Sequence, residues 1–378
     1  MKRAWPILLG LLLLAAPAAA QAQFGCVTNA DNTLTITNYT GTNTVVAIPT
    51  NINNLLVTGI GAQAFYNSAN LAGITIPTNV TSIGGFAFYA CAGLSSIVIP
   101  GGVTNIGDSA FEFCTHLTNV VIPASLTSIG NVVFEFCASL TSITIPDSVT
   151  SIGDSAFYGC ASLASVVIPD SVTNITAAAF HGCTGLTNVV IPDSLTSIGA
   201  EVFELCASLT SIVIPGSVTN IGYAAFYGCT SLTSITIPAS VTDIGSNAFE
   251  DCSKLTGVYF TGNAPAADGT VFTNDNAKVY YLAGATGWDD FSADTGLETV
   301  LWNPLIQVAG ANFGVQNNQF GFNITGTVNF TVVVEACTNL ASPVWTPLQI
   351  ATLTNGSFYF SDPQWSNYPA RFYGLGFP

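Results

Sequence analysis

The chain repeats one 23-residue unit without insertion over about half of its length. Its clearest marker is a cysteine that recurs at this step: Cys91, Cys114, Cys137, Cys160, Cys183, Cys206, Cys229 and Cys252. A phenylalanine keeps the same step from Phe65 to Phe249. A fixed period of this size is typical of solenoids, in which each unit packs only on its neighbours. The repeat therefore predicts a solenoid and favours a function in surface display or binding.

The unit that spans residues 137–159 shows how the repeat is expected to fold. Ile143 and Ile145 alternate with Thr144, which is the spacing of a strand with one buried face. Pro146 cannot donate a backbone hydrogen bond, so it should end the strand. Gly153 is expected to permit a tight corner. The remaining inward positions are Val149, Ile152, Ala156 and Phe157.

The cysteine column could form a ladder of disulfides or a metal site, or it could be buried packing. Secretion would permit a ladder of disulfides, and stacked turns would bring the cysteines close enough for one. However, the sequence has no CxxC pair of the kind that metal sites use, and Ser68 occupies the same column in the first unit. We therefore favour buried packing, mostly as free thiols. Cys26 and Cys337 lie outside the column and have no assignable partner.

Composition limits the partners of the chain. Hydrophobic residues make up 49% of the sequence and charged residues only 7%, with a formal net charge of −16. This negative field repels phosphate groups, so we expect no nucleic-acid binding and no attraction to an anionic membrane. Cationic partners and divalent ions remain compatible with it.

The N-terminus resembles a secretory signal. Lys2 and Arg3 precede an apolar run over residues 7–14, and small residues follow up to Ala22. The apolar run is too short to span a bilayer comfortably. We expect cleavage after Ala20 or Ala22, a secreted or cell-surface location, and no membrane insertion of the mature chain.

The repeat also resembles a known family. The pattern Leu-x-x-Ile-x-Ile-Pro-x-x-Val-x-x-Ile-Gly-x-x-Ala-Phe-x-x-Cys is similar to the BspA-type, or Treponema-type, leucine-rich repeats of bacterial surface proteins, over roughly residues 45–260. Thr176 departs from it at the corner glycine, and Phe113 and Phe136 replace the glycine before cysteine. The resemblance implies adhesion or recognition and carries over no catalytic residue.

We expect a mainly β chain organised in five segments. They are a signal peptide (residues 1–22), an N-terminal cap with the first partial repeat (23–64), the BspA-type leucine-rich repeats (65–260), a C-terminal cap (261–304) and a small β-sandwich-like domain (305–378). The C-terminal cap is expected to contain a strand near Val279 and an irregular loop near Trp288.

One variable column is the candidate ligand-binding surface. It follows the buried phenylalanine, so its side chains should face solvent, and it consists of Tyr89, Glu112, Glu135, Tyr158, His181, Glu204, Tyr227 and Glu250. A second column contains Asp147, Asp170 and Asp193, which should be exposed because like charges on neighbouring turns repel. No DxDxDG loop or GxSxG turn is present. We therefore predict no metal site, no cofactor, no catalytic residue and no enzyme activity.

These observations favour a recognition or adhesion protein that binds a protein or polysaccharide through the solenoid face. The alternative is a passive structural protein of the envelope or extracellular matrix. A third possibility, an enzyme with its site in the C-terminal module, would depend on few titratable groups: Glu335, Asp362 and Arg371.

Overall fold

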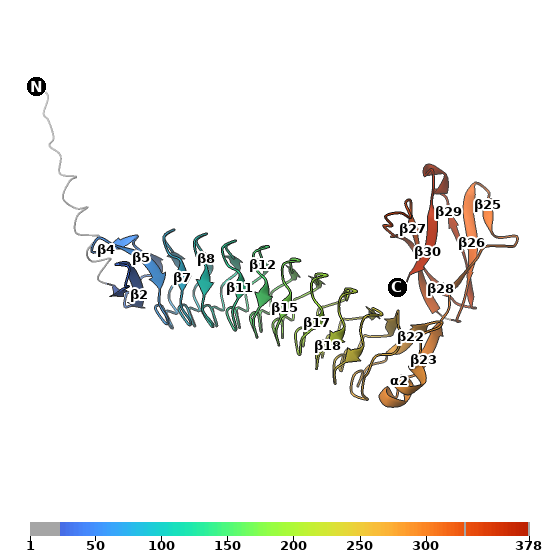
Figure 1. The fold of residues 1–378 in the computed structure, drawn as a ribbon, viewed down its shortest axis with the longest axis horizontal. Coiled ribbons are helices and arrows are strands. Elements are labelled where there is room, and N and C mark those ends of the chain that lie inside the picture. Colours follow the sequence, from blue (N-terminus) through green and yellow to red (C-terminus); the bar gives the residue numbers. More distant parts are fainter. Residues whose placement is uncertain (1–22, 329, 377–378) are drawn as a thin grey trace, which may run out of the picture. The chain divides into compact units, whose positions relative to one another are not determined.

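The computed structural model describes residues 23–328 and 330–376, so the predicted signal peptide lies outside the described residues. The chain forms two compact units (Figure 1). The first contains the chain up to Leu232 with residues 243–254 and 270–275. The second contains residues 233–242, 255–269 and 276–378.

The first unit is a solenoid in which each turn adds one strand to a parallel sheet. Neighbouring strands pair residue for residue at the 23-residue step, as Ser96 does with Asn119. The strands of this sheet are β3 (Val45–Ala47), β6 (Gly73–Thr75), β8 (Ser96–Val98), β10 (Asn119–Val121), β12 (Ser142–Thr144), β14 (Ser165–Val167) and β16 (Asn188–Val190). Figure 1 shows these turns side by side from β5 to β18.

A second, shorter strand follows in most turns. These strands are β7 (Ser82–Ile83), β9 (Asn105–Ile106), β11 (Ser128–Ile129), β13 (Ser151–Ile152), β15 (Asn174–Ile175), β17 (Ser197–Ile198), β18 (Asn220–Ile221) and β20 (Asp243–Ile244). At the N-terminal end, β1 (Phe24–Thr28) pairs antiparallel with β2 (Leu34–Tyr39). Strand β2 then pairs with β5 (Leu55–Ile60), which also forms a hairpin with β4 (Asn51–Ile52).

The predicted inward and outward positions are confirmed. Ile143 and Ile145 are buried and Thr144 is exposed, and strand β12 ends before Pro146. Phe157 is completely buried, and its ring stacks on that of Phe180 at 5.3 Å. No turn could bury these faces alone, so the stack of turns forms one continuous core.

The cysteine column is buried and its thiols are free, as we favoured from the sequence. Each thiol donates to the carbonyl oxygen of a phenylalanine in the preceding turn, for example Cys160 Sγ to Phe134 at 3.2 Å. Burial raises the pKa of Cys183 to about 12, so this thiol stays protonated and can serve as the donor. The column therefore stabilises the stack by packing and by hydrogen bonds between turns.

The corner glycine is required for a reason that differs from the prediction. Gly153 and Gly222 are not among the described glycines with left-handed backbone. Instead, a Cβ on Gly222 would lie 2.7 Å from the backbone nitrogen of Ala200, and one on Gly153 would lie 2.6 Å from the carbonyl carbon of Gly130. The corner therefore needs glycine because successive turns approach each other closely there.

The ladder of short strands is interrupted twice, between β9 and β11 and between β15 and β17. Both interruptions coincide with larger inward side chains. Leu126 and Val133 mark the first, and Leu195 and Val202 the second, whereas the other full turns carry Val and Ala at these positions. Added methyl groups in a packed core push its elements apart, and this accounts for the lost pairing.

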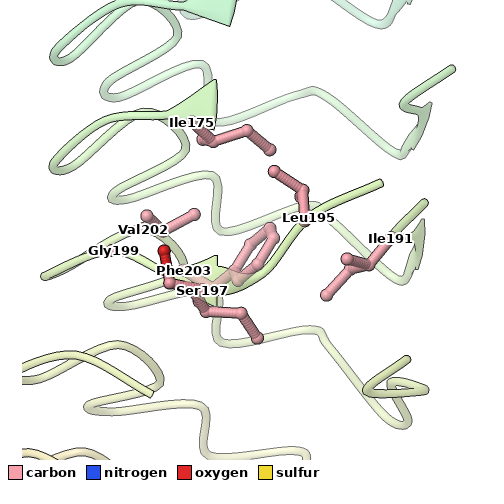
Figure 2. Close-up of a pocket in the computed structure, with 8 residues that line it drawn as sticks. Ile175, Ile191, Leu195, Ser197, Gly199, Val202 and Phe203 are labelled. Carbon is pink, nitrogen blue, oxygen red and sulfur yellow. The ribbon is translucent and has the colours of Figure 1, made fainter. Parts of the chain in front are cut away.

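A small cavity of about 10 Å³ marks the second interruption (Figure 2). It is lined mostly by apolar side chains, including Ile175, Leu195 and Phe203. A Cβ on Gly199 would lie 3.2 Å from the Ile175 oxygen, which shows that the two turns are further apart here than at Gly222. The cavity has room for about one water at most and is lined almost entirely by apolar groups, so it is a packing defect and not a ligand pocket.

The second unit begins with a parallel sheet of four strands, β19 (Ser234–Ile237), β21 (Gly257–Phe260), β22 (Lys278–Leu282) and β23 (Thr299–Trp302). The expectation of an irregular loop near Trp288 was wrong, because residues Trp288–Thr295 form helix α2. Left-handed Gly287 and Gly296 bound this helix, and its buried side chains Trp288 and Phe291 pack against Phe260. Two buried aromatic residues three positions apart stabilise a helix too short to be stable alone.

Two small antiparallel sheets complete the second unit. One contains β24 (Leu305–Gln307), β25 (Gly314–Gln316), β26 (Gln319–Thr325) and β29 (Ser357–Asp362). The other contains β27 (Phe330–Cys337), β28 (Thr346–Leu353) and β30 (Phe372–Gly376), and a short 3-10 helix, η1 (Trp365–Asn367), precedes β30. Phe322, Val332 and Leu353 share one core with Tyr259 and Trp302 of the preceding sheet. The core is therefore continuous across residue 304, where a domain boundary was expected.

The cysteine column ends in a carboxyl group, and this generates a testable pH dependence. Asp275 takes the position after Cys252, and burial raises its pKa from 3.8 to about 8, with Asp251 and Glu250 acting in the same direction. The folded state therefore holds the proton more tightly than the unfolded chain, and stability falls as the pH rises between these two values. In Asp275→Asn this contribution is absent, so the variant should gain stability over the wild type with rising pH. Denaturant unfolding at pH values below, between and above the two pKa values measures the difference in stability between the variant and the wild type. A difference that does not change with pH would contradict a raised pKa for Asp275.

Candidate binding surface

The eight residues of the predicted column lie along one edge of the first unit, one in each turn directly after the buried phenylalanine. All of them are half-buried, so they face solvent less fully than expected. The structure places them in contact with their neighbours along the column and with residues of two adjacent columns. Those contacts divide the edge into an aromatic part, a carboxylate pair and a mixed cluster.

The aromatic part is a continuous series of seven rings, which we call the aromatic ladder: Tyr66, Phe86, Tyr89, Phe113, Phe136, Tyr158 and His181. Tyr66 stacks on Tyr89 at 4.8 Å with nearly parallel planes, and Phe86 packs beside Tyr89 at 5.7 Å. Tyr66 is 48% exposed and Phe86 is 39% exposed, so the ladder is open to solvent at this end.

The middle of the aromatic ladder consists of two phenylalanine rings whose planes are steeply inclined to those of the neighbouring tyrosines. Phe113 stacks on Phe136 at 4.9 Å, and Phe113 meets Tyr89 edge to face at 5.6 Å. Phe136 in turn meets Tyr158 edge to face, and Tyr158 stacks on His181 at 4.3 Å. These geometries are the ones that aromatic pairs prefer, so the rings hold one another in place.

Phe113 and Phe136 occupy backbone positions that favour glycine. Their φ angles are +58° and +55°, in the left-handed region, where the corresponding residues of other turns include Gly159 and Gly182. The ring of Phe136 lies over Gly159, because a Cβ there would meet it at 2.6 Å. A left-handed residue with a Cβ costs about 1–2 kcal/mol. Bulky, partly exposed side chains at such positions point to a function of the surface.

Two carboxylates of the predicted column lie next to each other beside the aromatic ladder. Burial raises the pKa of Glu135, and the neighbouring charge of Glu112 raises it further. Neither carboxylate forms an ion pair with a basic side chain among the described residues. They are therefore available as hydrogen-bond acceptors for a cationic or hydroxyl-bearing group.

At its other end the aromatic ladder meets a cluster of three titratable groups. His181 Nδ1 lies 3.6 Å from Glu204 Oε2, and Glu201 lies close to both. Burial lowers the pKa of His181, while Glu201 opposes that shift. Burial, together with Glu201, raises the pKa of Glu204 to about 7. Both shifts favour the uncharged form of the group, which is the effect of removing it from water.

The last two predicted residues do not join the aromatic ladder. Tyr227 is hydrogen-bonded to Asp251, and Glu250 accepts a hydrogen bond from Asn247. The predicted column is thus one surface from Tyr89 to Glu204, and its remaining members belong to local networks.

The sequence reasoning missed five residues of this surface: Tyr66, Phe86, Phe113, Phe136 and Glu201. Tyr66 could have been found by extending the column one further step of 23 residues. The replacement of glycine by Phe113 and Phe136 was visible in the sequence, but its meaning depends on the backbone conformation. Phe86 and Glu201 lie in a neighbouring column, and only the turn geometry brings that column alongside.

A second exposed feature lies on the strand face of the solenoid. We call it the valine stripe, and its members are Val98, Val121, Val167, Val190 and Val213. Valine is a good strand residue, so these positions have a structural explanation. The predicted aspartate column, Asp147, Asp170 and Asp193, is exposed as expected.

Comparison with known proteins identifies the class of this solenoid. Residues 39–164 and 150–278 match the model of the BspA type leucine rich repeat region, in six copies. The match covers more than half of the chain, so the protein belongs to the BspA-type leucine-rich repeat family. The resemblance in the sequence is thereby confirmed. No curated protein shows significant similarity to the chain.

Several solved structures resemble the chain. A leucine-rich repeat protein of T. pallidum is 34% identical, and the match covers 50% of this chain and 88% of that one, with a TM-score of 0.47. A leucine-rich cell surface protein of Faecalibacterium prausnitzii is 29% identical over 64% of this chain and 94% of that one, with a TM-score of 0.32. The pneumococcal vaccine antigen PcpA is 18% identical over 74% and 96%, with a TM-score of 0.42.

The left-handed column that carries Phe113 and Phe136 generates a reciprocal prediction. Ala90 and Gly182 occupy this column in other turns, with φ angles of +53° and +68°, and a Cβ on Gly182 would meet nothing closer than 3.7 Å. Ala90→Gly should therefore stabilise the protein by up to about 1 kcal/mol, and Gly182→Ala should destabilise it by a similar amount. Thermal unfolding followed by circular dichroism tests both changes. A shift of the same sign in the two variants would show that backbone strain does not govern this column.

Proposed function

We propose that the protein is a secreted or cell-surface recognition protein that binds a protein partner through the aromatic ladder. The N-terminal sequence supports the location, because its basic, apolar and small-residue segments follow the order of a secretory signal. No helix among the described residues is long and apolar enough to cross a bilayer. The aromatic ladder supports the binding role.

One observation carries this proposal. Phe113 and Phe136 remain at left-handed positions where glycine would relieve strain, and the next two turns of the same chain do have glycine there. Packing of the core does not explain them, because both rings lie on the surface. Their ring contacts are with other members of the aromatic ladder, and Phe136 also lies over Gly159. Residues that lower stability and improve no core contact are typical of functional sites.

The arrangement of the rings favours a protein partner over a polysaccharide. The ring planes of Tyr66 and Tyr89 differ by 5°, and those of Phe113 and Phe136 by 16°. Their faces therefore cover one another, and a partner meets ring edges and tyrosine hydroxyl groups. Tyrosine and phenylalanine in this role are enriched in protein interfaces. A sugar ring would instead stack on an open aromatic face.

Charge further defines the partner. The chain has 21 acidic and five basic residues, and Glu112 and Glu135 lie beside the aromatic ladder. A partner with a basic surface would be attracted over a distance and oriented before contact. The proposed ligand is therefore a protein with a basic segment flanked by apolar side chains.

The double variant Phe113→Gly/Phe136→Gly tests this function without damaging the fold. It restores the residue that the backbone favours, so its thermal midpoint should equal or exceed that of the wild type. Binding should nevertheless weaken at least tenfold, which is the effect of losing one or two interface hot spots. Binding is measured on an array of extracellular-matrix proteins, with a glycan array in parallel.

The matched control is the triple variant Val98→Thr/Val121→Thr/Val167→Thr on the valine stripe. Threonine occupies the same column at Thr75 and Thr144, so the fold accepts it. This variant should bind like the wild type. Binding lost in the control and kept in the phenylalanine variant would overturn the proposed surface, and glycan binding alone would overturn the protein partner. A wild-type protein that binds neither array would favour the passive structural role.

A further inference from the structure

His181, Glu201 and Glu204 form the one group of three potential metal ligands within the part of the chain that the structure describes. Their ligand atoms all lie within 4.8 Å of one another. The histidine belongs to one turn of the solenoid and the two glutamates to the next. A turn closed by a 3.1 Å hydrogen bond from Glu204 N–H to the Glu201 oxygen places both carboxylates on the same side.

The ring of His181 has a fixed orientation, but its Nδ1 has no hydrogen-bond partner in the described part of the protein. Tyr158 stacks on the ring of His181 at 4.3 Å with planes 9° apart, and this contact fixes the ring orientation. His181 Nδ1 is buried from solvent and has no hydrogen-bond partner among the described residues. Glu204 Oε2 is near it, at 3.6 Å, but this is beyond hydrogen-bond distance. A buried polar atom without a partner needs an explanation, and binding of an ion is one of the few available.

The separations suit a transition-metal ion. Two ligands bound to Zn²⁺ at about 2.0–2.1 Å in tetrahedral geometry lie about 3.4 Å apart. The 3.6 Å between His181 and Glu204 is already close to this value. Glu201, which lies within 4.8 Å of the other two ligand atoms, would have to approach by up to about 1.4 Å, which is within reach of a side chain with three rotatable bonds. One imidazole and two carboxylates are donors that Zn²⁺ accepts.

The position of the cluster within the solenoid gives an independent argument. It bridges the two turns between which the short-strand ladder is interrupted, from β15 to β17. The buried rings of Phe180 and Phe203 in the same turns lie 5.8 Å apart, whereas those of Phe65 and Phe88 lie 5.1 Å apart. Backbone hydrogen bonds such as that from Gly182 N–H to the Glu204 oxygen, at 2.7 Å, still join the two turns beside the cluster. A metal ion here would add a further link between turns that lack the pairing of their short strands.

We propose that His181, Glu201 and Glu204 bind one divalent first-row transition-metal ion, with Zn²⁺ as the representative, and that the ion clamps these two turns. The fourth position would be filled by water, because the residues supply three ligands. The prediction of no metal site rested on the absence of a CxxC pair and of a DxDxDG loop from the sequence. The stacking of turns instead brings together residues that are 20 and 23 positions apart.

The test is a titration of the metal-stripped protein with Zn²⁺ by isothermal calorimetry. Every protein compared, including the one called wild type here, carries Cys26→Ser, because the exposed Cys26 thiol could itself bind Zn²⁺. The wild type should bind one equivalent. His181→Ala and Glu204→Gln should each weaken binding at least tenfold. Zn²⁺ should also raise the thermal midpoint of the wild type and not that of His181→Ala, because an ion that binds the folded state stabilises it.

His116→Ala is the matched control, because His116 is the only other histidine of the chain and lies outside the cluster. It should bind Zn²⁺ like the wild type. Anomalous scattering at the zinc edge should place the ion between His181 and Glu204. Equal binding by the wild type and His181→Ala, or no binding by the wild type, would overturn the site. The outcome of the Zn²⁺ titration does not depend on the proposed function, which the Phe113→Gly/Phe136→Gly variant tests separately.

Discussion

The stacking of each turn on the next at a fixed 23-residue register is the constraint on which the rest of the solenoid depends. Buried phenylalanine rings lie between 5.1 and 5.8 Å from their neighbours, and each column thiol donates to a carbonyl oxygen of the turn before it. No turn buries its own apolar face, so every inward side chain also sets the distance to the next turn. Leu195 and Val202 illustrate this, since a few additional methyl groups coincide with a broken strand ladder and a small cavity.

The same constraint determines which surface residues can interact. Side chains at the same position of successive turns lie about one strand spacing apart, which is close enough for rings to stack and for carboxylates to repel. Tyr66 and Tyr89 stack for this reason, and for the same reason Glu112 adds to the rise that burial causes in the pKa of Glu135. A surface column therefore behaves as a unit, and a change of residue type along it alters the interactions of both neighbours.

The sequence was sufficient for the repeat, the inward columns and the strand near Val279, because these follow from period and alternation; Val279 lies in β22 as expected. It was insufficient where the outcome depends on distances between columns. The corner at Gly153 was expected to need glycine for its conformation, but the close approach of Gly130 is the cause. Glu201 was missed because it joins His181 and Glu204 from a neighbouring column. Helix α2 was missed because the helix is short and depends on buried aromatic contacts that the sequence does not reveal.

His181 connects the two functional ideas, because its ring ends the aromatic ladder and its Nδ1 faces Glu204. An ion bound there would fix the imidazole, and the stack on Tyr158 would then have one immobile end. Tyr158 meets Phe136 edge to face, so that restraint would extend to the residues proposed to bind the partner. Ordering these side chains in advance lowers the entropy that binding has to remove. A metal clamp at the widened interval would therefore strengthen recognition without contacting the partner.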